Sequence, residues 1–442
     1  MRTFKLKHGN SEAIVDQIRK HTVKLDTAAD LDPLMERIGD SQYVLLGEAS
    51  HGTHDYYTWR THITKRLIAE KNFSFVAVEG DWPDCYKLNR YIKGYPGSGA
   101  DAKTVLQSFD RWPTWMWANW EVVALAEWMH KHNKLLPSNK KVGFYGLDVY
   151  SLWESMDAIM NYLEKTDPMA LKTAKKALNC FAPYIGQEGS MYGYASYMID
   201  SSCEREVVDL LSEIIRKLPM YNTDHETVFS TEQNAFVAVN AERYYRTMIK
   251  DGAGSWNIRD NHMFDTLNRL VEFYGANSKV IVWEHNSHIG DARATDMRKD
   301  GFINVGQLVK EQHENKGVVR IGFGSYEGTV VAGRQWGGKM EKMKIPPAKK
   351  GSLEYLLHEI GSPNQLLLTE NLKNIAAFSK PIDHRAIGVV YDPVHEKDGT
   401  YVPSYMTQRY EAFIFIDRSE ALHPLHIKPD GQQIPETYPF GV

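Results

Sequence analysis

The sequence predicts an α/β protein with a three-layer α/β/α core, a mostly parallel sheet and a helical insertion. Three observations support this fold class. Short apolar runs alternate with longer helical patterns over the first 150 residues, strand-like runs are absent from about 151 to 250, and they return afterwards. Strands that alternate with helices indicate parallel βαβ units, with helices on both faces of a sheet. We therefore expect 1–150 to form the first part of the α/β core, 151–250 the helical insertion and 251–442 the second part of the core.

The expected strands are short, apolar on both faces and bounded by Gly or Asp, as buried parallel strands are. Amphipathic helices are expected between the first of these strands, at 56–70 and 119–132. The segment PPAKKGS, residues 346–352, predicts a surface loop or lid, because its Pro and Lys residues offer little to bury. The predicted strands cover 43–47, 73–80, 141–148, 279–283, 318–324, 328–333, 386–392 and 412–417.

Composition and charge exclude several classes of protein. A net charge of −4 over 442 residues gives no reason to expect nucleic acid or an anionic membrane as a partner. No apolar stretch reaches the ~20 residues of a transmembrane helix, and the N-terminus has no signal-peptide pattern. An odd, widely spaced set of cysteines (Cys85, Cys180 and Cys203) argues against a disulfide framework. We expect buried thiols and a cytoplasmic location, and the oligomeric state cannot be predicted.

The stretch LLGEASHGTHDY, residues 45–56, leaves an apolar run and enters groups that can exchange protons: Glu48, His51, His54 and Asp55. Alone, such a stretch is compatible with a polar loop. Other predicted strands end in the same way, and parallel strands share one edge at which ligand crevices lie. The residues that follow them are Glu79, Asp81 and Trp82, then Asp148, then Glu284, His285 and His288, then Ser325 and Glu327, and Asp392. This pattern predicts an active site at the carboxyl edge of the sheet.

Histidines grouped with carboxylates can hold and deprotonate a water molecule or share protons with a substrate. Arg60 and Arg259 could hold an acidic substrate group or an oxyanion, or could form ion pairs with neighbouring acids. The sequence has no G-x-S-x-G nucleophile motif and no H-E-x-x-H zinc helix, which disfavours a serine hydrolase and a zincin. Several tryptophans could form apolar walls for a bulky substrate or could pack in the core: Trp59, Trp82, Trp112, Trp115, Trp117 and Trp120.

Five motifs spread over most of the chain resemble the erythromycin esterase family: LLGEASHGTHDYYTWR, VAVEGDWPD, YGLDVYSLW, NIRDNHM and HNSHIGDAR. They stand in the family's order, and as a group they are highly specific. The resemblance implies a three-layer α/β/α core with a helical insertion. It also implies hydrolysis of a macrolide lactone by an activated water molecule, without a covalent serine intermediate.

Carried over residue by residue, the resemblance implies that His51 is the general base and that Glu48 is an active-site carboxylate beside it. Glu79 is a second carboxylate that orients His51 or the water. His285 and His288 line the same pocket, and Arg259 lies near it. Asp81, Trp82, Asp148 and Arg60 are expected to contact the substrate with Arg259. The chain departs from the expected family pattern at Glu284, where we expect a small residue.

The function predicted from the sequence is therefore an ester or lactone hydrolase with a small-molecule substrate and antibiotic resistance as a candidate role. Metal-free catalysis is favoured, because Arg60 and Arg259 can compensate the carboxylate charges. A divalent metal held by His51, Glu48, Glu79, His285 and His288 is the alternative chemistry. The alternative function is a binding protein that uses the same pocket for a small molecule or a metal without turnover.

Overall fold

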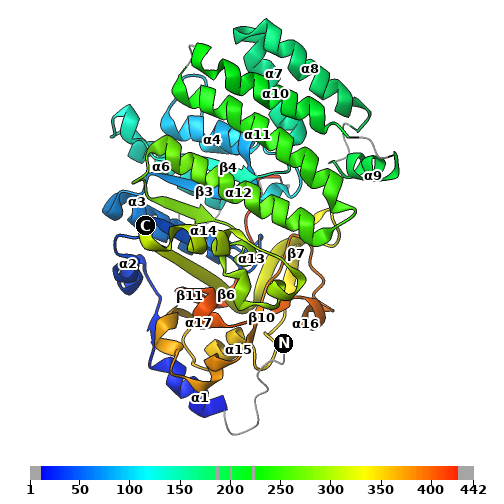
Figure 1. Cartoon of the computed structure of the whole chain (residues 1–442). Coiled ribbons are helices and arrows are strands. Elements are labelled where there is room, and N and C mark those ends of the chain that lie inside the picture. The colour runs from blue at the N-terminus through cyan, green and yellow to red at the C-terminus, as the bar shows by residue number, and fades with distance from the viewer. Residues whose placement is uncertain (1–10, 185–188, 200–201, 222–223, 427–442) are drawn as a thin grey trace. The chain divides into compact units, whose positions relative to one another are not determined.

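The computed structural model describes residues 11–184, 189–199, 202–221 and 224–426. The chain is a mixed α/β protein with a large, mostly parallel sheet flanked by helices, as predicted (Figure 1). It forms two compact units. The first comprises Met1–Val76, Arg90–Gly143 and Tyr274–Val442, and the second comprises Ala77–Asn89 and Phe144–Phe273. The division predicted from the sequence, with boundaries at 150 and 250, stays a prediction beside these two units.

The sheet of the first unit has the strand order β1-β8-β11-β6-β2-β5, and β7 pairs with β6. The pairs β11–β6, β6–β2 and β2–β5 are parallel, whereas β1, β7 and β8 run antiparallel to their neighbours. Strands β9 and β10 form a separate antiparallel ribbon. The bounds are β1 (Thr22–Lys24), β2 (Tyr43–Leu46), β5 (Val280–Trp283), β6 (Val318–Gly333), β7 (Met340–Ile345), β8 (Asn364–Leu368), β9 (Ile382–Arg385), β10 (Tyr401–Ser404) and β11 (Ala412–Ser419).

Strands β2 and β5 are buried along their whole length, which is why their sequences YVLL and VIVW are apolar throughout. Their parallel register places Leu46 beside Trp283, and on the other side of β2 it places Leu46 beside Ile321 of β6. The chain therefore leaves β2 and β5 at the same edge, in neighbouring positions. The segments that follow, 47–53 and 284–290, begin side by side.

Helices of the first unit flank this sheet. Helix α3 begins after Thr53 and ends before Asn72, which adopts the left-handed conformation that commonly terminates helices. Helix α6 is capped by Asn119, whose side chain accepts from the Val122 N–H. The bounds are α1 (Ser11–Arg19), α2 (Asp32–Ile38), α3 (His54–Lys71), α5 (Ala102–Leu106), α6 (Trp120–Asn133), α13 (Asn286–Ile289), α14 (Val305–His313), α15 (Leu353–His358), α16 (Glu396–Gly399) and α17 (Met406–Arg409).

The second unit combines two neighbouring strands with a group of long helices. Strands β3 (Phe75–Asp81) and β4 (Gly143–Asp148) belong to it from Ala77 and Phe144 onward. The helices predicted over 151–250 are present, and α12 extends the helical run to Tyr274. The bounds are α4 (Trp82–Lys93), α7 (Leu152–Thr166), α8 (Pro168–Phe181), α9 (Ser190–Ile199), α10 (Glu204–Lys217), α11 (His225–Met248) and α12 (Gly252–Tyr274).

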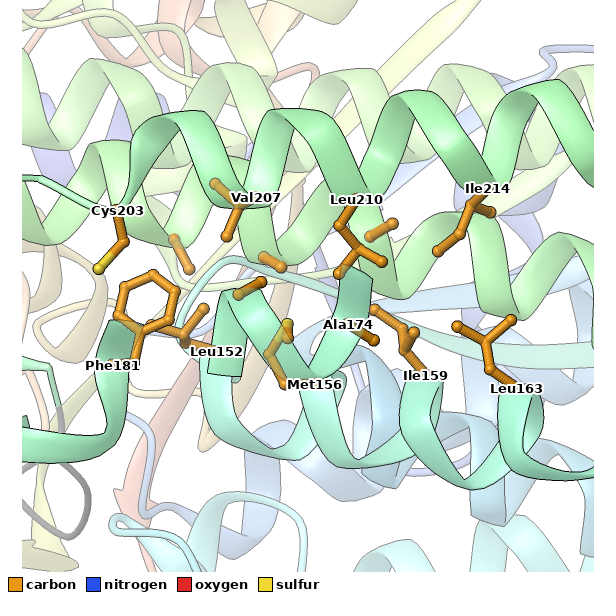
Figure 2. Close-up of a cluster of buried hydrophobic side chains, with 14 of the residues drawn as sticks. Leu152, Met156, Ile159, Leu163, Ala174, Phe181, Cys203, Val207, Leu210 and Ile214 are labelled. Carbon is orange, nitrogen blue, oxygen red and sulfur yellow. The ribbon is translucent and has the colours of Figure 1, made fainter. Parts of the chain in front are cut away.

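One buried hydrophobic cluster holds α7, α8, α10 and α11 together. Figure 2 shows its side chains pointing toward one another from facing helices, with Met156 and Ile159 of α7 opposite Leu210 and Ile214 of α10. Their spacing of three to four residues places them on one face of each helix. The helical insertion therefore has a hydrophobic core of its own.

The cysteine prediction was wrong for two of the three residues. Cys180 and Cys203 form a disulfide with a Cα–Cα distance of 5.9 Å, whereas Cys85 is a free, buried thiol as expected. Packing of α8 against α10 brings together the end of one helix and the residue that precedes the other. Nothing in a sequence separation of 23 residues reveals that approach.

Two strand predictions were also wrong. Residues 318–333 form one strand, so Ser325 and Glu327 lie inside β6 rather than at a strand end. Residues 386–392 form no strand, only isolated bridges from Ile387 to Ser50 and from Val390 to Gly333. Asp392 is exposed and pairs with His395 at 2.7 Å. The run was apolar enough to suggest a strand, but its backbone hydrogen bonds go to Ala49 and Thr400 outside the strands and to Gly333 at the end of β6.

Residues 346–352 form a loop, as predicted, and hydrogen bonds anchor it. Lys349 donates to the Asp383 carboxylate at 2.7 Å, and its backbone N–H donates to the Tyr401 hydroxyl at 2.8 Å. Arg385 donates to the Pro346 carbonyl at 2.8 Å. These bonds fix the loop to β9 and β10, so it lacks the loose attachment of a lid. In the described ranges, no helix has the length and apolar character needed to cross a membrane.

Candidate active site

The residues that follow β2 and β5 in the first unit form a short row of polar contacts. His51 Nδ1 lies 2.9 Å from Glu48 Oε1, and Arg60 donates to the second carboxylate oxygen, Oε2, at 2.8 Å. Both glutamate oxygens are therefore engaged, one by an imidazole and one by a guanidinium. An ionised Glu48 accepts the Nδ1–H of His51, which leaves the basic lone pair of the neutral ring on Nε2.

Arg60 contacts Glu48 from a buried position between two aromatic rings. Its side chain is 0% exposed, and its guanidinium lies 4.2 Å from the Tyr57 ring and 4.5 Å from the Trp283 ring. A planar cation between two aromatic faces is held in one orientation. The substrate contact expected of Arg60 stays a prediction, and the full burial of its side chain does not favour it. Arg60 is a positioning residue that fixes the carboxylate of Glu48.

His285 faces His51, with ring centroids 4.9 Å apart. Its Nδ1 accepts the backbone N–H of Ser287 at 3.2 Å and lies 2.8 Å from the Ser287 hydroxyl. An Nδ1 that accepts an N–H carries no proton, so the neutral ring of His285 has its proton on Nε2. His51 and His285 thus present opposite Nε2 roles, one as acceptor and one as donor. His288 is buried one turn later, where its N–H donates to the His285 carbonyl at 2.9 Å.

Asn286 fixes the segment that carries both of these histidines. Its backbone N–H donates to the Glu48 carbonyl at 2.9 Å, which ties the ends of β2 and β5 together. Its side-chain amide donates to the Phe323 carbonyl at 2.7 Å and accepts the Phe323 N–H at 3.2 Å. Gly47 leaves room for this amide, because a Cβ at that position would lie 2.1 Å from Asn286 Oδ1. Glu284, the residue at which the sequence departs from the expected family pattern, is fully buried and directly precedes this segment.

A buried histidine–glutamate pair contacts the side-chain amide of Asn286. Asn286 Nδ2 lies 3.2 Å from His384 Nε2, and His384 Nδ1 lies 2.6 Å from Glu354 Oε1. Burial lowers the pKa of His384, so the ring is neutral and donates through Nδ1. Burial alone would raise the pKa of Glu354, but the His384 ring and the Arg385 guanidinium lower it. Sequence reasoning missed this pair, because it lies on α15 and β9, away from the motifs.

The second unit contains a separate group built on Arg259 of α12. Arg259 donates to Asp148 from Nε at 2.9 Å and from NH2 at 2.6 Å, and NH2 also donates to Glu79 at 2.7 Å. Burial alone would raise the pKa of Asp148, but the charge of Arg259 lowers it. The same two carboxylates raise the pKa of Arg259 well above its ordinary value, although burial opposes this. Three of the predicted site residues are thus brought together as one ionised cluster.

The remaining predicted substrate contacts in the second unit are less open. Trp82 is 1% exposed, donates from its indole N–H to Ser230 at 3.1 Å and stacks on Tyr145. Asp81 is the last residue of β3 and is half-buried.

The tryptophans of the first unit are mostly buried. Burial of Trp59, Trp115, Trp117 and Trp120 favours core packing over walls for a substrate. Trp112 is partly exposed and lies against Trp336.

The structure therefore joins the predicted residues as two groups. Glu48, His51, Arg60 and His285 form one group in the first unit, where His288 follows His285. Glu79, Asp148 and Arg259 form the other in the second unit. The prediction that all of them serve one catalytic pocket stays a prediction. Sequence reasoning did not single out Asn286. Its position between the two candidate histidines of the motif HNSH was the one signal that pointed to it.

Comparisons with a family model and with curated proteins both point to the erythromycin esterase family. A sequence model of the erythromycin esterase family matches residues 68–419. This range includes Glu79, Arg259 and the two histidines of HNSH, and it begins after the segment with Glu48 and His51. Among curated proteins, the chain is similar to erythromycin esterase type II of Escherichia coli, with 22% identity over 373 residues, covering 78% of this chain and 85% of that protein.

Solved structures share the fold over nearly the whole chain. A succinoglycan biosynthesis protein matches with a TM-score of 0.74 and 23% identity, over 95% of this chain and 100% of that one. A histidine-to-asparagine mutant of the erythromycin esterase EreC, in its open conformation, matches with a TM-score of 0.65 and 14% identity, over 90% of this chain and 97% of that one. At these identities the likeness establishes the fold and leaves the substrate open.

Proposed function

The chain belongs to the erythromycin esterase family, and from this premise we propose that it hydrolyses an ester or lactone of a small molecule with a water activated by His51. Family membership supports an ester hydrolase. The row Arg60–Glu48–His51 is the single observation that carries the assignment of the base. A carboxylate that accepts the Nδ1–H of a histidine fixes its tautomer and stabilises the imidazolium formed when Nε2 takes a proton.

In this mechanism His51 Nε2 removes a proton from water as the water attacks the ester carbonyl carbon. The negative charge that develops on the carbonyl oxygen needs a hydrogen-bond donor. His285 is suited to this task, because the Ser287 N–H occupies its Nδ1 and leaves the proton on Nε2. Collapse of the tetrahedral intermediate then returns the proton from His51 to the leaving alkoxide. No covalent acyl-enzyme forms, in agreement with the lack of a G-x-S-x-G motif.

We propose that the substrate is a macrolide lactone or a related bulky ester, since two of the similar proteins are named as erythromycin esterases. Hydrolysis of such a lactone opens the ring and adds one water molecule. Resistance to a macrolide would then be the biological role. The roles predicted for Glu79, Asp81, Trp82, Asp148, Arg259 and His288 at this pocket remain part of the proposal.

The decisive experiment incubates the purified chain with a panel of macrolides and simple lactones in water enriched in ¹⁸O. Mass spectrometry should show one solvent oxygen in the product acid, and His51→Asn should lower turnover by about 100-fold or more. If the His51→Asn variant incorporates solvent oxygen at the wild-type rate, His51 is not the base. Tight binding of a panel member with no turnover would instead assign the pocket to a binding protein.

The same assay tests metal dependence. With His51 as a metal-free base, turnover should be unchanged after dialysis against a chelator. Loss of turnover with the chelator, restored by a divalent metal in the wild-type chain, would favour the alternative in which the metal ligands come from the predicted set His51, Glu48, Glu79, His285 and His288.

A further inference from the structure

A second cluster of histidine and glutamate side chains lies in the first unit, outside the row Arg60–Glu48–His51. Among the residues that the structure describes, one group of histidine, cysteine and acidic side chains has ligand atoms that all lie within 4.8 Å of one another: His54, Glu121 and His423. His54 Nδ1 and His423 Nδ1 each lie 2.7 Å from the same oxygen, Glu121 Oε1. The cluster thus joins the first residue of α3, the first turn of α6 and the segment after β11.

Backbone hydrogen bonds hold these three segments in place without help from the cluster. We call residues 420–425 the C-terminal strap. The strap is tied to the start of α3, because His54 N–H donates to the Glu420 carbonyl at 2.8 Å and Leu422 N–H donates to the Gly52 carbonyl at 3.0 Å. It is tied to the start of α6, because Trp120 N–H donates to the His423 carbonyl at 3.0 Å. The two histidines and the glutamate are therefore preorganised.

The hydrogen bonds around His54 are compatible with a ring proton on Nε2. The Thr58 hydroxyl donates to the His54 carbonyl at 3.1 Å, so its oxygen accepts from His54 Nε2 at 3.3 Å. A neutral His54 then carries its lone pair on Nδ1, and this lone pair faces the Glu121 carboxylate at 2.7 Å. In this tautomer the two acceptors need a positive centre between them, which a metal cation supplies, whereas a proton on Nδ1 would make an ordinary hydrogen bond to Glu121. An Nε2–H donated to a hydroxyl is also the outer contact that orients metal-binding histidines.

We propose that His54, Glu121 and His423 form a binding site for a divalent first-row metal of the zinc type, which fastens the C-terminal strap to α3 and α6. Two imidazoles and one carboxylate suit such a cation, and water completes a tetrahedral shell. Zinc ligands at about 2.1 Å from the metal lie about 3.4 Å apart. Each ring therefore moves about 0.7 Å from its 2.7 Å contact to admit the ion.

Burial and charge agree with this assignment. The Glu121 side chain is 0% exposed, that of His54 is 10% exposed and that of His423 is 36% exposed, so His423 provides the route by which the metal enters. Asp55 accepts the Glu420 N–H at 2.7 Å and places further acidic groups beside the cluster. The surroundings are therefore negative on balance, which favours a cation. The site is built from residues other than the proposed base, so its occupancy is independent of hydrolysis.

The test measures metal binding to the full chain after removal of metals by a chelator. Zn²⁺ titration by calorimetry should show one equivalent bound, and X-ray absorption should show a shell of nitrogen and oxygen atoms that includes two imidazoles, without sulfur. The zinc-bound chain should also unfold at a higher temperature. Glu121→Gln and His423→Gln should each weaken binding by about 100-fold or more, because each removes a direct ligand. Circular dichroism reports whether these variants remain folded.

Two controls separate this site from other histidines. His395→Gln removes an exposed histidine paired with Asp392, and His51→Asn removes the proposed base; both should bind zinc as the wild-type chain does. Absence of a zinc equivalent in the wild-type chain would overturn the proposal and leave a proton-bridged cluster. Loss of the equivalent in His51→Asn but not in His423→Gln would also overturn it, because the metal would then lie at the proposed catalytic group. His423 is partly exposed, so its replacement keeps the test valid even if Glu121→Gln fails to fold.

Discussion

His51 and His285 are chemically identical side chains whose surroundings give them different tasks. A carboxylate accepts from Nδ1 of His51, whereas a backbone N–H donates to Nδ1 of His285. The first arrangement makes Nε2 a base and the second makes Nε2 a donor. Neither role can be predicted from the letters of the motifs, because both depend on which hydrogen-bond partner reaches Nδ1 in the fold.

Glu48→Gln tests the role of the carboxylate in the row Arg60–Glu48–His51. The amide keeps the size of the side chain but removes the charge that stabilises protonated His51. We expect kcat to fall by about 10–100-fold with little change in KM, since Glu48 acts through His51. The acidic limb of the pH–rate profile should also move to lower pH, because loss of the anion lowers the pKa of His51.

Glu70→Gln is the matched control, since Glu70 is an exposed partner of Arg66 on the same helix as Arg60. This variant should keep both kcat and the pH profile of the wild-type chain. An unchanged pH profile in Glu48→Gln, even with slower turnover, would mean that Glu48 supports only the fold and does not tune the base.

The pair His384–Glu354 gives the stability of the chain a defined pH dependence. Folding lowers the pKa of His384 below its ordinary 6.5, so protonation favours the unfolded chain and stability falls as the pH drops below 6.5. Folding also lowers the pKa of Glu354, so a second loss begins below its ordinary 4.5. In thermal unfolding scans, His384→Gln should be less stable at pH 7.5 yet should lose less between pH 7.5 and 5. A wild-type midpoint that stays level over that range would contradict this account.

At the level of elements, the sequence was most informative where burial is complete. The strands β2 and β5 were predicted to within one residue, because fully buried parallel strands are apolar on both faces. The strands β1, β7, β8, β9 and β10 were missed. β7 has the sequence MEKMKI, in which Lys342 and Lys344 are exposed and Glu341 is partly exposed, so it has too few apolar residues to stand out. Short strands that contain polar residues were therefore less predictable than the apolar strands β2 and β5.

The candidate site was also predicted only in part, because local motifs reveal its residues but not the contacts between distant segments. The histidines and carboxylates were found because they follow buried strands in motifs. The tie from Asn286 to Phe323 was not found, because it joins residues that are distant in the sequence and depends on the register of β5, β2 and β6. The burial of Arg60 was not found either, because its aromatic neighbour Trp283 comes from another strand.

Gly47→Ala tests how strictly the two strand ends are joined. The new Cβ would lie 2.1 Å from Asn286 Oδ1 and 3.1 Å from the Ile321 carbonyl, so the Asn286 amide must leave Phe323. We expect a loss of about 1–3 kcal/mol in the free energy of unfolding. We also expect a clear fall in kcat/KM, because His285 is displaced with Asn286. Gly388→Ala is the control, since a Cβ there meets nothing within 4 Å. Equal behaviour of the two variants would show that Asn286 does not set the position of the site.

For the whole molecule, the fold class could be read from the alternation of strands and helices, because that pattern is repeated along the chain. The covalent link between Cys180 and Cys203 could not. The composition is that of an ordinary globular protein with few cysteines, and the expected cytoplasmic location rested in part on that cysteine count. The disulfide removes this argument, because such bonds persist mainly in oxidising surroundings.

The disulfide also makes the stability of the second unit sensitive to redox conditions. It closes a loop with a sequence separation of 23 and joins α8 to α10 beside the cluster that contains Phe181 and Val207 (Figure 2). A cross-link of this length stabilises a folded chain by about 3 kcal/mol, mainly by restricting the unfolded chain. We expect a reductant to lower the unfolding midpoint of the wild-type chain but to leave the double variant Cys180→Ala, Cys203→Ala unchanged, while Cys85→Ala responds as the wild-type chain does. If hydrolysis depends on an intact helical insertion, the rate should fall along with that midpoint. A reductant that shifts the midpoint of the double variant as much as that of the wild-type chain would show that the effect arises elsewhere.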